Sequence, residues 1–168
     1  MDGTFQISGL TAGPNTVCVQ VPGGVFVDTC EWTKTPLTVD VKAGQAVGGL
    51  AVKLKQGALL QVHLNDPGNL LVPSATAVVQ TVPHVLMAVQ TPRGLLHPLA
   101  PTSKDATGAT HTATVPFDTN LKFTIFSPHV SLADSKGAAI GPAGSNVPLT
   151  FPSGSNPAPL TFSVTGPK

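Results

Sequence analysis

The sequence predicts an all-β protein built of two abutting β-sandwich modules, an incomplete one at residues 1–56 and a second at residues 57–168. Two observations predict this class. Short alternating or β-branched runs recur along the chain, separated by turns rich in Gly, Pro and Asn. Helices are disfavoured because Pro or Gly, 17 of each in 168 residues, interrupts every apolar pattern before it completes three helical turns.

The strands are expected at residues 4–8, 16–21, 25–32, 37–41, 46–55, 58–64, 75–81, 85–90, 110–115, 121–127, 130–132, 146–150 and 160–164. The module boundary is placed at Gln56 and Gly57, where strand-forming residues continue almost without a pause. The linker between the modules is therefore short, and one merged sandwich is the alternative. Residues 91–108 show no clear strand pattern and are predicted to form the longest loop.

The opening strand, residues 4–8, has no earlier strand to pair with, so either the strands that should precede it are missing or something else fills the open edge. Phe5 and Ile7 fall on one face of it because side chains alternate along a strand. We therefore expect an open sheet edge with unpaired backbone groups and exposed apolar surface. Such an edge favours β-augmentation, in which a strand of one chain fills the groove of the next. A contact of this kind that does not close into a ring produces a filament.

Residues 1–56 contain the pattern Gly3-x-Phe5-x-Ile7-x-Gly9-Leu10-x-x-Gly13, then Val17-x-Val19 and Val39-x-Val41-x-x-Gly44-Gln45. This pattern resembles the second half of a carboxypeptidase regulatory-like domain, a transthyretin-like β-sandwich. The chain departs from that family at Pro14-Asn15, where the family usually has an aromatic residue.

Residues 57–168 contain the phrases Val115-Pro-Phe-Asp-Thr119 and Ser131-Leu-Ala-Asp134. They resemble an immunoglobulin-like partner domain that follows such modules in long secreted proteins of soil bacteria. The two resemblances imply a secreted, non-catalytic bacterial module used for spacing, folding support or binding. They imply no active site that can be carried over residue by residue.

The two cysteines, Cys18 and Cys30, fall in strand-like segments on either side of Pro22-Gly23-Gly24. Folding these segments back on each other brings the sulfurs together, and we predict a disulfide, with two buried free thiols as the alternative. A disulfide that closes so short a loop contributes on the order of 2–3 kcal/mol. It implies an oxidising compartment, so we expect a secreted or cell-surface, extracellular protein.

Charge and motifs argue against several classes of function. A net charge of +1 provides no field to attract nucleic acid or an anionic membrane. No apolar run approaches the roughly 18–20 residues of a membrane span. The chain has no Gly-x-Ser-x-Gly, phosphate loop or dinucleotide fingerprint, and Glu31 is its only glutamate, which leaves no glutamate pair for glycoside hydrolysis. We predict no enzyme activity, no catalytic residues and no cofactor.

The histidines and aspartates show no spacing typical of a metal site. The five histidines are His63, His84, His97, His111 and His129. His63 and His111 sit in predicted strands and could face each other across a sheet, but zinc needs three or four convergent ligands. Asp105, Asp118 and Asp134 lie in turn sequences, where capping of the turn is the simplest role, and no calcium-loop motif is present. We predict no metal.

Trp32 and Arg93 are the candidate ligand contacts. A lone Trp two residues from Cys30 favours a structural role, although an exposed Trp can stack on a sugar ring. Arg93, the only arginine, lies in the predicted long loop and could bind a carboxylate, with a solvated loop charge as the alternative. With one Trp and no Tyr, the aromatic platform typical of carbohydrate-binding modules is absent.

The expected function is structural: a module without chemistry of its own, whose partners are copies of itself or neighbouring modules, assembling through the open edge into filaments. The alternative is an extracellular binding module for polysaccharide or a protein partner. Residues 78–82 and 85–89 are β-prone and uncharged, and either would be a docking edge if exposed, with a central strand as the simpler expectation.

Overall fold

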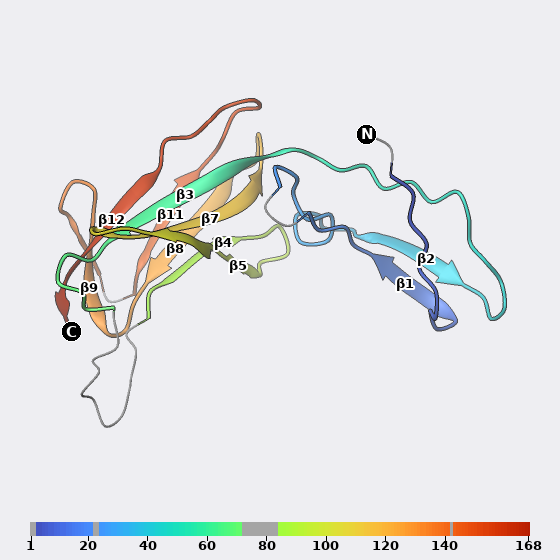
Figure 1. The fold of residues 1–168 in the computed structure, drawn as a ribbon, viewed down its shortest axis with the longest axis horizontal. Coiled ribbons are helices and arrows are strands. Elements are labelled where there is room, and N and C mark those ends of the chain that lie inside the picture. Colours follow the sequence, from blue (N-terminus) through green and yellow to red (C-terminus); the bar gives the residue numbers. More distant parts are fainter. Residues whose placement is uncertain (1–2, 22–23, 72–83, 142) are drawn as a thin grey trace, which may run out of the picture.

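The computed structural model describes residues 3–21, 24–71, 84–141 and 143–168, and it is all-β (Figure 1). The strands are β1 (Gly13–Val17), β2 (Leu37–Val41), β3 (Gly57–Asn65), β4 (Leu86–Gln90), β5 (Leu96–Pro98), β6 (Ala100–Lys104), β7 (Gly108–Pro116), β8 (Leu121–Phe126), β9 (Val130–Asp134), β10 (Ala139–Ile140), β11 (Ser145–Leu149) and β12 (Leu160–Pro167). No helix occurs among the described residues, and hence none long and apolar enough to cross a membrane.

Strands β3 to β12 form two sheets that pack over one core. The first sheet has the order β10-β9-β12-β3-β7-β6 and the second has the order β11-β8-β4-β5. Phe123 of β8 and Phe162 of β12 join the two sheets, with ring centroids 5.7 Å apart. Both rings lie in the buried cluster, which also draws on β3, β4, β7 and β9. This part of the chain is a β-sandwich, as expected from the sequence.

Strand β3 shows why the sequence folds in this way. Leu60, Val62 and Leu64 are almost completely buried, while Gln61 and His63 between them are partly exposed. Because successive side chains point to opposite faces, one face of β3 enters the core and the other faces outward. β3 pairs antiparallel with β7 over its whole length and parallel with β12 over four residues.

The chain changes sheets between β5 and β6. β5 pairs with β4 in one sheet, and β6 pairs with β7 in the other. Leu99, the residue between them, is buried and donates its backbone N–H to the Met87 carbonyl oxygen at 2.9 Å. The predicted loop at residues 91–108 is therefore wrong over much of its length, because it contains β5 and β6, one edge strand of each sheet.

Strands β1 and β2 form a separate antiparallel sheet, with Gly13 opposite Val41 and Val17 opposite Leu37. This sheet lies at the far end of the molecule from the sandwich (Figure 1). Residues 3–10 run past it without forming a strand, and so do residues 42–55 on the way to β3. The predicted strands at 4–8 and 46–55 are wrong, because neither segment has a ladder partner among the described residues.

Most sandwich strands were predicted close to their observed bounds, and 37–41 matches β2. The predicted strands at 16–21 and 25–32 are wrong over most of their length, since β1 ends at Val17 and pairs with β2, and residues 25–32 contribute one isolated bridge, Phe26 to Gln56. The predicted strand at 75–81 and the segment 78–82 lie outside the described residues. Residues 86–90 of the other β-prone segment form β4, an inner strand between β8 and β5, as expected.

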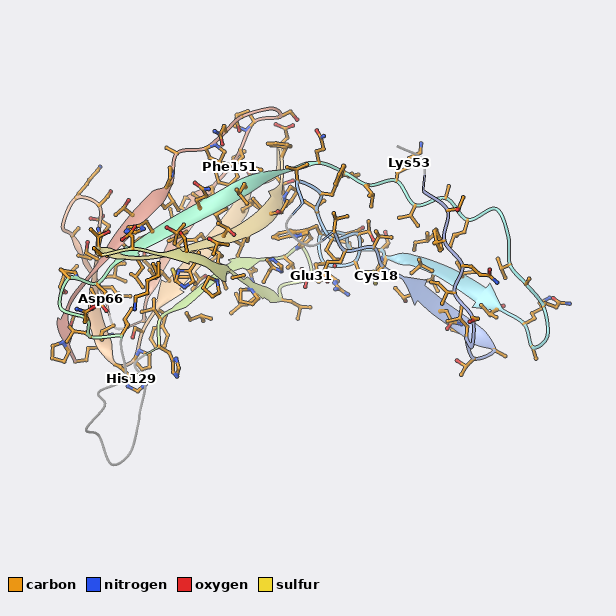
Figure 2. All side chains as sticks on the ribbon, in the orientation of Figure 1. Cys18, Glu31, Lys53, Asp66, His129 and Phe151 are labelled. Atoms are coloured by element: carbon orange, nitrogen blue, oxygen red, sulfur yellow. A yellow bond between two sulfur atoms is a disulfide. The ribbon has the colours of Figure 1, made fainter. Side chains whose placement is uncertain are left out.

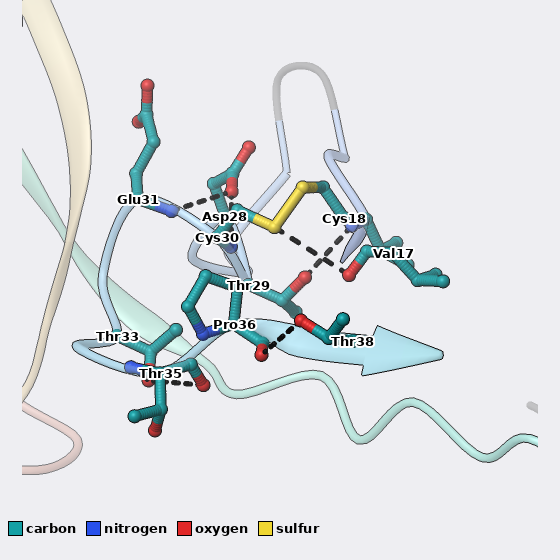
Figure 3. The surroundings of a disulfide bond; sticks show 11 residues. Val17, Cys18, Asp28, Thr29, Cys30, Glu31, Thr33, Thr35, Pro36 and Thr38 are labelled. Atoms are coloured by element: carbon teal, nitrogen blue, oxygen red, sulfur yellow. Dashed lines mark hydrogen bonds between the residues drawn. A yellow bond between two sulfur atoms is a disulfide. The ribbon is translucent and has the colours of Figure 1, made fainter. Parts of the chain in front are cut away.

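The predicted disulfide between Cys18 and Cys30 is present and joins residues whose Cα atoms are 5.3 Å apart (Figure 3). It closes a lobe, residues 18–32, that we call the disulfide lobe. Thr29 ties the two sides together: its hydroxyl accepts the Val19 N–H at 2.9 Å, and its own N–H donates to the Val19 carbonyl oxygen at 3.3 Å. The disulfide and these two hydrogen bonds thus join the two sides of the lobe.

The disulfide lobe docks on the start of β3. The Val27 N–H donates to the Lys55 carbonyl oxygen at 2.9 Å, and the Gly57 N–H donates to the Val25 carbonyl oxygen at 2.7 Å. A Cβ atom at Gly57 would lie 2.4 Å from the Val115 carbonyl oxygen and 2.6 Å from Val27 Cγ1. Only glycine allows the lobe and β7 to approach the chain this closely.

Candidate functional site

Two hollows on the surface are candidates for a functional site. The first, the N-terminal groove, has a volume of about 620 Å³ and is lined by residues 3–10, Asn15, Val17, Val39 and 41–50. One wall is the β1–β2 sheet, and the others are the two extended segments that flank it. The groove thus occupies the part of the molecule where strand-like sequence lacks strand partners among the described residues.

The lining of the N-terminal groove includes several exposed apolar side chains. Phe5 is 51% exposed, Ile7 is 54% exposed and Val47 is 51% exposed. Their neighbours Thr4 and Gln6 alternate with them, as in a strand whose apolar face awaits cover. Among the described residues of the lining, Lys42 is the only one with a formal charge. The groove can therefore accept an uncharged, extended polypeptide with apolar side chains on one face.

The second hollow, the Trp32 cleft, has a volume of about 560 Å³ and lies between the disulfide lobe and the outer face of the larger sheet. From the lobe it is lined by Gln20, Val21, Gly24, Phe26, Asp28 and Trp32, and from the sandwich by Leu59, Gln61, His97, Pro98, Ala100, Thr102, Thr112, Ala113 and Thr114. Because its two walls come from the lobe and from the sandwich, the cleft exists only when the lobe is docked on the sandwich.

A turn at residues 28–32 presents the lobe's side of the cleft. The Asp28 carboxylate accepts the backbone N–H groups of Cys30 at 2.7 Å and Glu31 at 3.0 Å, which fixes the turn (Figure 3). Glu31 Oε2 then reaches His97 Nδ1 on β5 at 2.5 Å, and both atoms are shielded from solvent. The Trp32 ring meets the His97 ring edge-on, with centroids 5.5 Å apart.

The two predicted ligand contacts fall in different places. Trp32 is partly buried and lines the cleft beside His97, so it has both a structural contact and a face on a hollow. Arg93 lies in the exposed turn between β4 and β5 and is not among the residues that line either hollow. The structure therefore does not bring these two side chains into one site. His97 was considered only as a possible metal ligand, and its place beside Trp32 depends on long-range packing.

The idea that His63 and His111 face each other is wrong. His63 is opposite Thr110 and His111 is opposite Val62, so the two rings lie on different faces of the β3–β7 pair. His63 is held on the outer face by the hydroxyls of Thr110 at 3.0 Å and Thr107 at 3.1 Å. Within the described parts of the chain, no group of three His, Cys, Asp or Glu residues could hold a metal ion.

The carboxylates of Asp105, Asp118 and Asp134, which the sequence places in turns, accept hydrogen bonds from backbone N–H groups of turn residues. Asp134 Oδ1 accepts the N–H groups of Lys136 and Ala138, both at 2.9 Å, and Asp118 Oδ1 accepts the Ser153 N–H at 3.1 Å. Asp105 accepts the hydroxyl and the N–H of Thr107 and the N–H of Gly108. These hydrogen bonds, the Thr107 hydroxyl first, lower the pKa of Asp105 below its usual value. Asp105 and Asp134 thus cap their own turns, whereas Asp118 links its turn to the distant loop at Ser153.

His111 is expected to make stability depend on pH. Burial lowers the pKa of His111 below 6.5, so the unfolded chain binds a proton more readily than the folded one. The free energy of unfolding should therefore fall as the pH falls below about 6.5. Urea titrations at several pH values should show this decline, and His111→Asn should flatten it between neutral pH and pH 5. His84→Asn, at an exposed position, is the control and should leave the decline intact.

Comparison with known proteins provides no further assignment. No known protein family, no curated protein sequence and no solved structure matches the chain. The resemblances to carboxypeptidase regulatory-like and immunoglobulin-like domains therefore remain predictions, and the site has to be interpreted from its own chemistry.

Proposed function

We propose that the protein is a non-catalytic, secreted or cell-surface structural module that joins to other copies of itself by β-strand addition in the N-terminal groove. The donor is the segment 3–10 of one copy, and the acceptor is the rest of the groove of the next copy, formed by the β1–β2 sheet and residues 42–50. Because donor and acceptor are different surfaces, the contact is heterologous, and an arrangement that does not close produces a filament. The observation that supports this most is the apolar groove between two unpaired strand-like segments.

The chemistry of segment 3–10 supports its role as donor. It contains neither proline nor a charged residue, and Phe5 and Ile7 form an apolar face that is half exposed. Entry into a neighbour's groove would cover this face and would pair backbone N–H and C=O groups that have no ladder partner among the described residues. In an isolated copy the apolar face stays half exposed and these backbone groups stay without a ladder partner among the described residues.

The edge strands of the sandwich also support the N-terminal groove, and not the sandwich, as the surface for assembly. β5 ends with Pro98, β6 carries Pro101 and Lys104, β11 carries Pro148, and β10 is only two residues long. Proline, lysine and short length are the devices that prevent edge strands from pairing with other chains. Assembly is therefore favoured at the N-terminal half and opposed at the sandwich edges.

The disulfide supports the location. Cys18 and Cys30 are the only cysteines of the chain, and both are used in the bond. Such bonds persist in oxidising surroundings outside the cytosol. Low charge and a surface rich in Thr, Ser and Asn fit an extracellular β-module.

Assembly is tested by comparing the unaltered chain with two variants. Light scattering and negative-stain microscopy of the oxidised protein should show large assemblies that grow with concentration. The double substitution Phe5→Asn with Ile7→Asn should leave a monomer of 17.1 kDa, because it removes the apolar face of the donor. Gln6→Asn, on the other face of the same segment, should still assemble. A chain that stays monomeric at every concentration would contradict the proposal.

A further inference from the structure

The Trp32 cleft has the chemistry of a small binding site and is separate from the N-terminal groove. Its volume of about 560 Å³ falls within the roughly 300–1,000 Å³ typical of ligand pockets. It combines the aromatic ring of Trp32 with hydroxyl and amide side chains on the facing sheet. Whatever binds there must suit both an apolar ring and a row of neutral hydrogen-bonding groups.

Two neighbouring strands supply two polar groups that are free to bind. Gln61 of β3 and Thr112 of β7 are directly opposite each other and project from the outer face of the sheet. Neither side chain has a hydrogen-bond partner among the described residues. By contrast, Thr114 donates its hydroxyl to the Gly24 carbonyl oxygen at 3.0 Å, and Thr102 donates to the Thr110 carbonyl oxygen at 3.2 Å. The cleft floor thus offers one uncommitted amide beside one uncommitted hydroxyl.

The charges around the cleft restrict the ligand class. Asp28 is the only Asp or Glu among the described residues of the lining, and its Oδ1 already accepts two backbone N–H groups. Among the described residues no lysine or arginine lines the cleft, and His97, the ring that could carry a positive charge, already pairs with Glu31. The His97 ring forms part of the cleft wall beside Trp32. A neutral ligand with many hydroxyl groups fits this environment better than an ion does.

From these observations we infer that the Trp32 cleft binds one unit of a neutral saccharide. The sugar lies with its C–H face against the Trp32 ring, and its hydroxyls bond with Gln61 and Thr112. A single ring provides a single subsite rather than a platform, so the affinity is modest, in the millimolar to micromolar range. This inference does not depend on strand addition in the N-terminal groove.

The chain supplies its own probe. Trp32 is the only tryptophan and there is no tyrosine, so the intrinsic emission comes from the cleft. We would titrate the Phe5→Asn, Ile7→Asn chain, which removes any effect of assembly, with cellohexaose, mannohexaose, xylohexaose and chitohexaose. The acidic oligogalacturonate hexamer and a polyproline decapeptide complete the panel. At least one neutral sugar should change the emission saturably, and calorimetry should confirm the binding.

Two threonine-to-valine substitutions, which replace a hydroxyl by a methyl group of similar size, test whether the sugar binds in the cleft. Thr112→Val should weaken binding of that sugar about fivefold to tenfold, the loss of one hydrogen bond. Thr161→Val, on β12 of the same sheet but outside the cleft, should leave the affinity unchanged. Trp32→Ala should abolish the calorimetric signal while the circular dichroism spectrum stays that of a folded sandwich. The inference is overturned by no response to any neutral sugar, by a response to the acidic sugar or the peptide alone, or by equal losses in the two threonine variants.

Discussion

Phe123→Ala should lower the free energy of unfolding of the sandwich by about 3–5 kcal/mol, the usual cost of removing a buried aromatic ring. Phe123 of β8 is completely buried and packs on Phe162 of the opposite sheet. Truncation removes the central contact between the sheets and leaves a cavity, since the surrounding strands relax only in part. Urea denaturation followed by circular dichroism measures the change, at a protein concentration where the chain is monomeric.

Phe5→Ala is the matched control, because it removes the same ring from a half-exposed position in the N-terminal groove. It should change the free energy of unfolding by no more than about 0.5 kcal/mol. In the assembly measurement the order should reverse: Phe5→Ala weakens assembly, whereas Phe123→Ala leaves assembly unchanged under conditions in which its sandwich stays folded. A cost below about 1 kcal/mol for Phe123→Ala would contradict the core described above.

The sandwich was predictable because its strands follow the pattern of one buried face. In β3 and β8 apolar residues alternate with polar ones, and burial of the apolar face determines both the strand and its register. Turns with an internal carboxylate, such as that of Asp134, mark the ends of these strands. Local sequence therefore carried most of the information for this part of the chain.

The N-terminal half was harder to predict because a strand needs a partner as well as a pattern. Residues 4–8 alternate as clearly as β3 does, yet no ladder forms there. The opposite error concerned β5 and β6, which lie where the sequence shows no clear strand pattern and which contain Pro98 and Pro101, residues that are disfavoured in strands. Both lie at sheet edges, where a missing N–H costs little. Sequence alone does not show which segments will be edges.

The candidate sites also differ in how far local sequence predicts them. The disulfide followed from two local segments and one turn, and an exposed apolar face at Phe5 and Ile7 followed from alternation. The Trp32 cleft did not follow, because it depends on contacts of Glu31 and Trp32 with His97 from a distant part of the chain. Its only local signal was a lone Trp beside a cysteine.

Replacing both Cys18 and Cys30 by alanine should destabilise the disulfide lobe by about 2–3 kcal/mol while leaving the sandwich almost unchanged. The lobe has few other ties, and its backbone joins the rest of the chain chiefly at the start of β3. Glu31, labelled in Figure 2 between Cys18 and the sandwich, is one of its few side-chain anchors. Loss of the cross-link increases the freedom of the unfolded lobe and so favours its opening.

Two probes separate the two halves of the molecule in that variant. Trp32 emission reports on the lobe, and circular dichroism reports mainly on the strands of the sandwich. In urea, the Trp32 transition of the alanine variant should move to lower denaturant concentration while the circular dichroism transition stays in place. Limited proteolysis should then cut within residues 18–32 before it cuts the sandwich. If both transitions move together, the lobe and the sandwich unfold as one cooperative unit, and the Trp32 cleft is as stable as the core beneath it.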